Sequence, residues 1–354
     1  MLLDQDKTYK PYDKSNIGAD IARMHEQVEI AWRETRDIKM PKAYRGVTNV
    51  VVVGMGGSHL GPHLAVSAFR DRLRVPVVRV RGYSLPSFVS SKTLVVLSSF
   101  SGTTEEVLYA GREAKKRKAK IAVLTAGGKL GAFARRNKFP EYRFNPKELA
   151  AQPRLGTGFL MMGFAGLLER AGLLKLSGKD AKAMSDAMQE VTSVTSREVP
   201  AKCNPAKFVA RALKGRSLLI ASSEHLVGNA HVMANQINEN AKQLADFVEI
   251  PELNHHLMEG LTYPKGLTKK TTVLVLHSEL YHERVQKRYD FTAQVFEKQG
   301  AKVIEYFAGG RSAIQEAGEV LQFGAFLSYY LGMLNKENPE KIPYVDWFKK
   351  KMVK

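Results

Sequence analysis

The stretch LVVLSSFSGTTEE at residues 94–106 passes from an apolar run into a turn rich in hydroxyl groups and then into a helical pattern. The run predicts a buried strand, and the turn after it predicts the N-terminus of a helix. Backbone N–H groups at that end have no partner within the helix, and the helix dipole attracts negative charge. Since capping a helix needs only one hydroxyl, the group Ser99, Ser101 and Thr104 predicts a binding site for a phosphate.

A second stretch, NVVVVGMGGS at residues 49–58, has the same organisation. Gly56 and Gly57 can adopt positive φ and let a ligand approach the backbone, and Ser58 adds a hydroxyl. A glycine-rich turn of this kind also binds dinucleotides. Here the spacing differs from GxGxxG, and no acidic residue ends the next predicted strand at 77–81, where a nicotinamide cofactor would need one. The turn therefore favours a sugar or phosphate ligand.

Strand-like and helical patterns alternate along most of the chain, which predicts an α/β fold with two doubly wound, mostly parallel sheets. In the second half, residues 218–222 correspond to 50–54 and residues 272–277 to 93–98, as in a degenerate repeat, but the glycines and clustered hydroxyls are missing. The phosphate site is therefore expected in the first half. The predicted strands lie at 49–54, 76–80, 93–98, 121–125, 217–222, 272–276 and 302–307, and the predicted helices at 17–35, 59–70, 105–116, 228–244, 281–299 and 313–334.

This alternation also gives the expected domain organisation. At 354 residues the chain is long enough for two domains of ordinary size. We expect an N-terminal helical segment (1–45), a first α/β domain that carries the phosphate-binding loops (46–152), connecting helices (153–200), a second, degenerate α/β domain (201–335) and a C-terminal helix (336–354).

The composition limits the kinds of partner. No apolar run approaches the ~20 residues of a membrane span, the first residues are too acidic for a signal peptide, and Cys203 is the only cysteine. We therefore expect a cytoplasmic protein without a membrane partner. The formal net charge of +19 favours anionic partners. Because the basic runs at 115–118 and 349–351 lack interleaved aromatic residues, we interpret them as solvated helix faces and expect no specific nucleic-acid partner.

Several motifs resemble those of known isomerases. Residues 56–58 (GGS) followed by 99–106 (SFSGTTEE) resemble the sugar isomerase (SIS) domain, and the tandem repeat resembles the phosphoglucose isomerase superfamily. Residues 236–242 (QINENAK) and 251–255 (PELNH) resemble the bifunctional phosphoglucose/phosphomannose isomerases. The resemblance implies flavodoxin-like three-layer α/β/α domains with flanking helices. It also implies an aldose–ketose isomerase that interconverts glucose 6-phosphate and mannose 6-phosphate with fructose 6-phosphate through a cis-enediol, without a cofactor.

The same resemblance implies roles for two charged residues. Glu239 matches the family's base, which moves a proton between C2 and C1 of the open-chain sugar. Arg154 matches an arginine that stabilises the enediolate. The residues by themselves allow other interpretations: a solvated glutamate paired with Lys242 or Gln243, and an ordinary surface arginine. The substrate phosphate would bind at Gly56, Gly57, Ser58, Ser99, Ser101 and Thr104.

Two further residues match those that open the sugar ring in this family. His255 belongs to the PELNH motif, and in the family this histidine reaches the active site of the neighbouring subunit, which implies a homodimer with composite sites. Lys349 matches a lysine on the closing helix that returns to the active site. Three consecutive lysines leave Lys350, or a solvated basic tail, as alternatives.

A metal site is not expected. His59 and His63 are four residues apart on a predicted helix, but no third ligand lies near them in the sequence, so we interpret them as two surface histidines. Two other functions remain open from the sequence. One is a SIS regulator that binds a sugar phosphate without turnover, and the other is an amino-sugar-phosphate isomerase.

Overall fold

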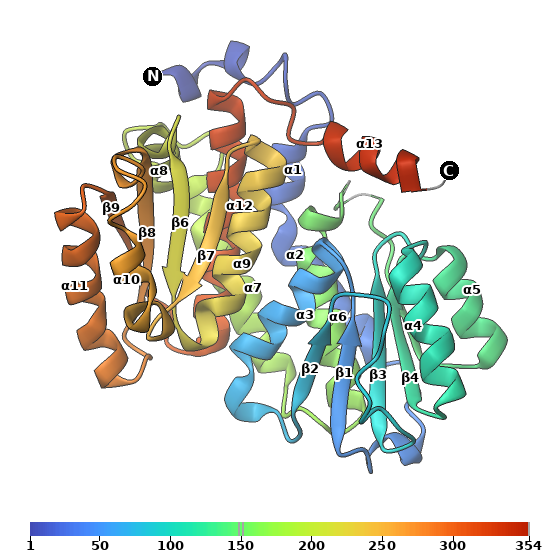
Figure 1. Cartoon of the computed structure of the whole chain (residues 1–354). Helices are drawn as coiled ribbons and strands as arrows, with labels where there is room; N and C mark the ends of the chain where they lie inside the picture. Colours follow the sequence, from blue (N-terminus) through green and yellow to red (C-terminus); the bar gives the residue numbers. More distant parts are fainter. Residues whose placement is uncertain (148, 151, 353–354) are drawn as a thin grey trace.

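The computed structural model describes residues 1–147, 149–150 and 152–352, and within them the chain forms two β-sheets covered by helices (Figure 1). The strand order is β2-β1-β3-β4-β5 in the first sheet and β7-β6-β8-β9 in the second, and every pair of neighbouring strands is parallel. The strands are β1 (Asn49–Val53), β2 (Val77–Val80), β3 (Thr93–Ser99), β4 (Lys120–Thr125), β5 (Glu141–Arg143), β6 (Ser217–Ser222), β7 (Ala245–Glu249), β8 (Thr271–Ser278) and β9 (Lys302–Ala308).

The strand order confirms the predicted doubly wound α/β class. The first sheet has the flavodoxin-like order 2-1-3-4-5, and the second repeats its first four places, so β6 occupies the place of β1 and β8 that of β3. These are the two correspondences expected from the sequence repeat.

Helices surround both sheets. The α-helices are α1 (Ile17–Ala22), α2 (Met24–Thr35), α3 (Gly57–Ala68), α4 (Glu105–Lys116), α5 (Gly128–Asn137), α6 (Thr157–Arg170), α7 (Gly178–Thr195), α8 (Pro205–Leu213), α9 (Val227–Gln236), α10 (Leu257–Gly260), α11 (Glu283–Lys298), α12 (Ala313–Leu334) and α13 (Pro343–Met352). Short helices are η1 (Leu2–Asp4), η2 (Asp6–Thr8), η3 (Lys42–Tyr44), η4 (Arg70–Arg72), η5 (Pro153–Leu155), η6 (Glu224–Leu226), the π-helix η7 (Ile237–Ala241), η8 (Glu252–His255) and η9 (Thr268–Lys270). Within the described residues, no helix combines the length and the apolar character that crossing a membrane requires.

Alternate residues of each strand of the first sheet face opposite layers. Val51 and Val53 of β1 pack with Val107 of α4 in a smaller core on the outer face. Val50 and Val52 belong to a larger core on the inner face, which extends through α3 and α6 to the strands of the second sheet. Figure 1 shows α4 and α5 on the outer side of the first sheet, and α9 and α12 between the sheets. The two halves therefore share one apolar interior.

The structure departs from the predicted elements at several points, and helices α5 and α8 are among the elements that were not predicted. Strands β5 and β7 were not predicted, because β5 has only three residues, two of them charged, and β7 carries Asp246 and Glu249. The helix predicted over 228–244 is too long: α9 ends at Gln236 and continues as the π-helix η7. That short π-helix carries Glu239.

Candidate active site

The two hydroxyl-rich turns lie side by side at the carboxyl end of the first sheet. Strands β1 and β3 are neighbours in register, with Val53 opposite Leu97, so the loops after them meet. The backbone N–H of Phe100 donates to Oγ of Ser58 at 2.7 Å, and Oγ of Ser98 donates to the carbonyl of Ser58 at 2.7 Å. Helices α3 and α4 begin within these loops, so their N-termini point to the same edge.

The hydroxyls predicted to bind phosphate form short hydrogen-bonded pairs. Oγ of Ser99 lies 2.8 Å from Oγ1 of Thr104, and Oγ of Ser101 lies 2.9 Å from Oγ1 of Thr103. Gly102 adopts φ +68°, and a Cβ there would lie 1.9 Å from the carbonyl oxygen of Gly127. A side chain at this position would therefore force the loop apart, which explains the glycine between the hydroxyls.

Arg154 is almost completely buried, with 1% of its surface exposed. Its Nη1 lies 2.9 Å from the carboxylate of Glu239, and its Nε donates to Oδ1 of Asn240 at 2.6 Å. Its Nη2 donates to the carbonyl of Glu340 at 2.9 Å and also to that of Pro339. Burial lowers the pKa of Arg154, and the nearby carboxylate of Glu239 acts in the opposite direction. The interpretation as an ordinary surface arginine is therefore wrong.

The glycine loop touches the segment that carries this arginine. A Cβ on Gly57 would lie 2.7 Å from the carbonyl carbon of Pro153 and 3.0 Å from the backbone nitrogen of Arg154. The beginning of α3 thus packs directly on η5. The structure therefore places the two predicted phosphate loops, Arg154 and Glu239 in one region, although these residues come from four separate parts of the sequence.

Glu239 does not pair with Lys242 through its side chain. The Nζ of Lys242 instead donates to the backbone carbonyl of Glu239 at 2.9 Å and to that of Asn338. The carboxylate of Glu239, 26% exposed, keeps one side on Arg154 and the other open. π-Helices are rare in proteins, and those that occur are often found at functional sites. The position of Glu239 in the π-helix η7 therefore favours a functional role for this residue.

Three residues of this region were not assigned a role from the sequence. Asn240 is buried and donates to Ser328 of α12 at 2.9 Å while it accepts from Arg154. Gln236 donates to the carbonyl of Arg154 at 3.1 Å. Asn240, Gln236 and Lys242 all belong to the QINENAK motif. That motif was the feature of the sequence from which their proximity to Glu239 could have been predicted. Its polar residues hold Glu239 and Arg154 in position.

In the described part of the chain, the two predicted ring-opening residues, His255 and Lys349, do not contact the Arg154–Glu239 ion pair through hydrogen bonds or ion pairs. His255 is exposed at the end of η8, and Nδ2 of its neighbour Asn254 donates to Oγ1 of Thr292 of α11 at 2.8 Å. Lys349 lies on α13, whose residues are all exposed. Among the described residues, no hydrogen bond or ion pair joins either side chain to Arg154 or Glu239.

The interpretation of His59 and His63 as surface histidines is wrong. They are 2% and 3% exposed, because α3 is covered by α6 and α9 and has no solvent-facing side at these positions. A third histidine, His231 of α9, lies beside them. It is 168 residues from His63 along the chain, so spacing could not reveal it.

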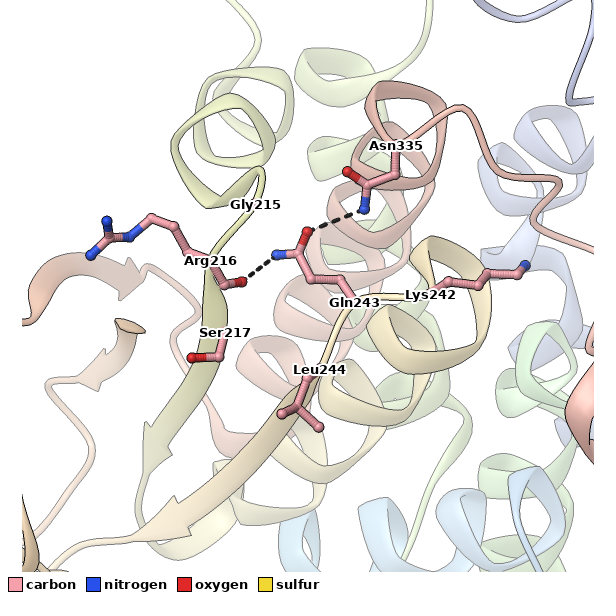
Figure 2. A pocket seen from close by; sticks show the side chains of 7 residues that line it. All are labelled: Gly215, Arg216, Ser217, Lys242, Gln243, Leu244 and Asn335. Carbon is pink, nitrogen blue, oxygen red and sulfur yellow. Dashed lines mark hydrogen bonds between the residues drawn. The ribbon is translucent and has the colours of Figure 1, made fainter. Parts of the chain in front are cut away.

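A separate pocket lies at the start of β6 (Figure 2). In it Gln243 accepts a hydrogen bond from Asn335 at 3.1 Å and donates to the carbonyl of Arg216 at 2.7 Å. Figure 2 shows the side chain of Lys242 pointing away from Arg216 and Ser217. Because Gln243 bridges three chain segments, we interpret this pocket as a structural junction. It holds none of the predicted site residues.

Two parallel sheets of like strand order, with hydroxyl-rich loops on the first, define a protein of the SIS class. The model of the "Bacterial phospho-glucose isomerase C-terminal SIS domain" family matches residues 202–352. A hypothetical protein from Thermus thermophilus has a similar solved structure, with a TM-score of 0.73 and 16% identity over 99% of this chain and 92% of that one.

Sequence relatives narrow this class. A bifunctional phosphoglucose/phosphomannose isomerase from Caldicellulosiruptor bescii is 30% identical over 336 residues, which are 94% of this chain and 97% of that protein. One from Aquifex aeolicus is 28% identical, over 88% of this chain and 91% of its own length. The chain belongs to the family of bifunctional phosphoglucose/phosphomannose isomerases.

The environment of Lys242 predicts a pH dependence. Burial and the charge of Arg154 lower the pKa of Lys242 to about 8, against 10.5 for an ordinary lysine. Between these pH values the unfolded chain binds a proton that the folded chain does not, so the contribution of Lys242 to stability rises with pH. We expect the free energy of unfolding of the wild type, relative to Lys242→Met, to increase across this window. Urea unfolding at both ends of the window measures it, and a constant difference would contradict the assignment.

Proposed function

We propose that the protein interconverts glucose 6-phosphate and mannose 6-phosphate with fructose 6-phosphate. The observation that carries the proposal is the buried ion pair of Arg154 and Glu239 beside two hydroxyl-rich helix N-termini. A carboxylate that is fixed on one side and open on the other suits a proton transfer, and the loops suit a phosphate. The names of the family's relatives support the same substrates.

Glu239 acts as the base in this proposal. Its carboxylate removes the proton from C2 of the open-chain aldose, and the electron pair forms the C1=C2 bond while the carbonyl oxygen on C1 becomes negative. Protonation of that oxygen gives the cis-enediol. Glu239 then returns its proton to C1 as the hydroxyl on C2 becomes the ketone and releases its own proton. The reaction is balanced without an oxidant or reductant, so it needs no redox cofactor.

Arg154 stabilises the negative charge that develops on the enediolate. Its guanidinium is held by Glu239, Asn240 and two backbone carbonyls, so it needs no reorganisation during the reaction. Water is largely excluded around it, and electrostatic interactions are stronger there than in bulk solvent. The phosphate is proposed to bind at Gly56, Gly57, Ser58, Ser99, Ser101 and Thr104.

The protein is further proposed to work as a homodimer with composite sites. His255 is exposed and contacts neither Arg154 nor Glu239 in its own chain, which supports a role in the site of a neighbouring subunit. Helix α13 exposes Tyr344, Trp347 and Phe348 at 86%, 60% and 58%. Such exposed aromatic rings are the kind of apolar surface that a second chain would cover.

The domain limits given by the sequence, 1–45, 46–152, 153–200, 201–335 and 336–354, are retained as part of this proposal. They are supported by the break between β5 and β6, where the two sheets separate. A cytoplasmic location is also proposed, since the one cysteine, Cys203, leaves no intrachain disulfide to form.

Replacing the base tests the function itself. In the wild type, fructose 6-phosphate should yield both aldose phosphates, measured by NMR. Glu239→Gln should slow this by about 10²- to 10⁴-fold, because an amide cannot take up the proton. Its amide oxygen still accepts from Arg154, so folding and fructose 6-phosphate binding, followed by calorimetry, should persist. Glu297→Gln, on the exposed face of α11, is the matched control. Equal turnover in both variants would exclude Glu239 as the base.

Mixing two inactive variants tests the composite site. A dimer of one Glu239→Gln subunit and one His255→Ala subunit contains one intact site only if histidine and glutamate come from different chains. After co-refolding equal amounts, half of the dimers are mixed and each has one working site, so about a quarter of the wild-type activity should return. No recovery in verified mixed dimers would show that both residues act within one chain.

The C-terminal lysines can be separated by substitution. Lys349→Met should lower kcat for glucose 6-phosphate by at least about tenfold, as expected for loss of an acid–base group, whereas Lys350→Met should stay close to wild type. The reverse order would move the role to Lys350. Equal activity of both variants and the wild type would identify the tail as solvated charge.

A further inference from the structure

Three histidines meet where the two halves of the chain join. His59 and His63 lie one turn apart on α3, and His231 comes from α9. One ring nitrogen of each lies within 4.8 Å of the other two. The Nδ1 atoms of His63 and His231 are only 2.8 Å apart, and the His59 ring is centred 6.0 Å from that of His231.

Local structure explains why these rings converge. Residues four apart on a helix lie on one face, which aligns His59 with His63. A Cβ on Gly228 would lie 2.5 Å from Cα of Leu64, so only glycine allows α9 to approach α3 this closely. His231 follows three residues later on α9, and the ring of Phe247 stacks on it with centroids 4.6 Å apart.

The rings have the charge state that a metal ligand needs. Burial is the main cause that lowers the pKa of His59 to about 3, that of His63 to about 2 and that of His231 to about 4. At neutral pH each imidazole is therefore neutral and keeps one nitrogen lone pair free for a metal ion. Buried Nδ1 of His59 has no hydrogen-bond partner among the described residues.

Other charges also surround the cluster. Nη1 of Arg79 lies 3.5 Å from Nε2 of His59, and Arg79 and Arg81 both lower the pKa of His231. Asp246 acts on His231 with the opposite sign, and Glu249 acts on Arg79. A cation bound between the rings would displace the guanidinium of Arg79 from His59. The guanidinium would then keep its electrostatic interaction with Glu249.

We propose that His59, His63 and His231 form a binding site for a divalent transition-metal ion of the Zn²⁺ type. Zinc binds imidazole nitrogens at about 2.0–2.1 Å, so tetrahedral ligands lie roughly 3.3 Å apart. Small ring rotations would widen the 2.8 Å contact of His63 and His231 and bring His59 closer. Imidazole suits zinc, copper and nickel, and water would take the fourth position.

The position of this site indicates that a bound ion would stabilise the junction between the two halves of the chain. Helix α3 begins at the glycine loop, and α9 leads directly into the π-helix that carries Glu239. An ion held by both helices would cross-link the two halves between the phosphate loops and the base. The inference rests on the histidines alone and is independent of the proposed reaction.

Metal titration tests the site directly. The full-length protein would be stripped with a chelator, dialysed and titrated with Zn²⁺ by calorimetry, with bound metal counted by elemental analysis. We expect about one tight ion per chain. His231→Asn and His59→Asn should each weaken binding by at least about a hundredfold, because even outer partners of metal ligands are worth 10- to 100-fold. His25→Asn on α2 is the control that should bind as the wild type does.

Cobalt gives a readout that does not depend on the variants folding. Co²⁺ bound to the wild type should show the intense visible absorption of a four-coordinate site, and Zn²⁺ should abolish it by displacement. No stoichiometric ion in the wild type, the weak spectrum of hydrated cobalt, or unchanged affinity in folded His231→Asn would each overturn the proposal.

Discussion

The buried guanidinium of Arg154 is the interaction on which the arrangement of this protein depends. A charge taken out of water is costly unless every donor finds an acceptor, and removal of one partner from such a network is strongly destabilising. Here the acceptors come from η7 and from the segment before α13. The hydrogen bonds that satisfy the guanidinium of Arg154 therefore fix the position of Glu239 and also that of the segment leading into α13. The same contacts leave the carboxylate of Glu239 partly exposed.

The parallel sheets supply the second constraint. In a doubly wound sheet the loops after neighbouring strands meet at one edge, which brings the turns after β1 and β3 together without any special contact. The second sheet repeats the strand order but not the chemistry of the turns. It instead supplies the π-helix between α9 and β7, whose Glu239 lies across the junction from the glycine loop. In the proposed function the two copies would share one site, with phosphate binding by the first and proton transfer by the second.

The sequence predicted most of this fold from its apolar runs, because buried parallel strands such as β1 and β8 are continuous and easily recognised. It could not predict β5 or β7, whose pairing depends on neighbours distant in sequence. The hydroxyl-rich turns were recognisable since both strands and helix starts are local features. The burial of Arg154 and the approach of His231 to His63 depend on tertiary packing. The spacing of these residues along the sequence therefore could not predict either feature. Resemblance to a family, rather than local pattern, singled out Glu239 and Arg154.

The most direct measurement is incubation of the purified wild-type protein with fructose 6-phosphate in D₂O, with the aldose products followed by NMR. We expect glucose 6-phosphate and mannose 6-phosphate, both with deuterium at C2, because a carboxylate that carries the proton exchanges it with solvent before returning it. Binding of fructose 6-phosphate without any aldose product would contradict the proposed isomerase activity and identify the chain as a sugar-phosphate-binding protein.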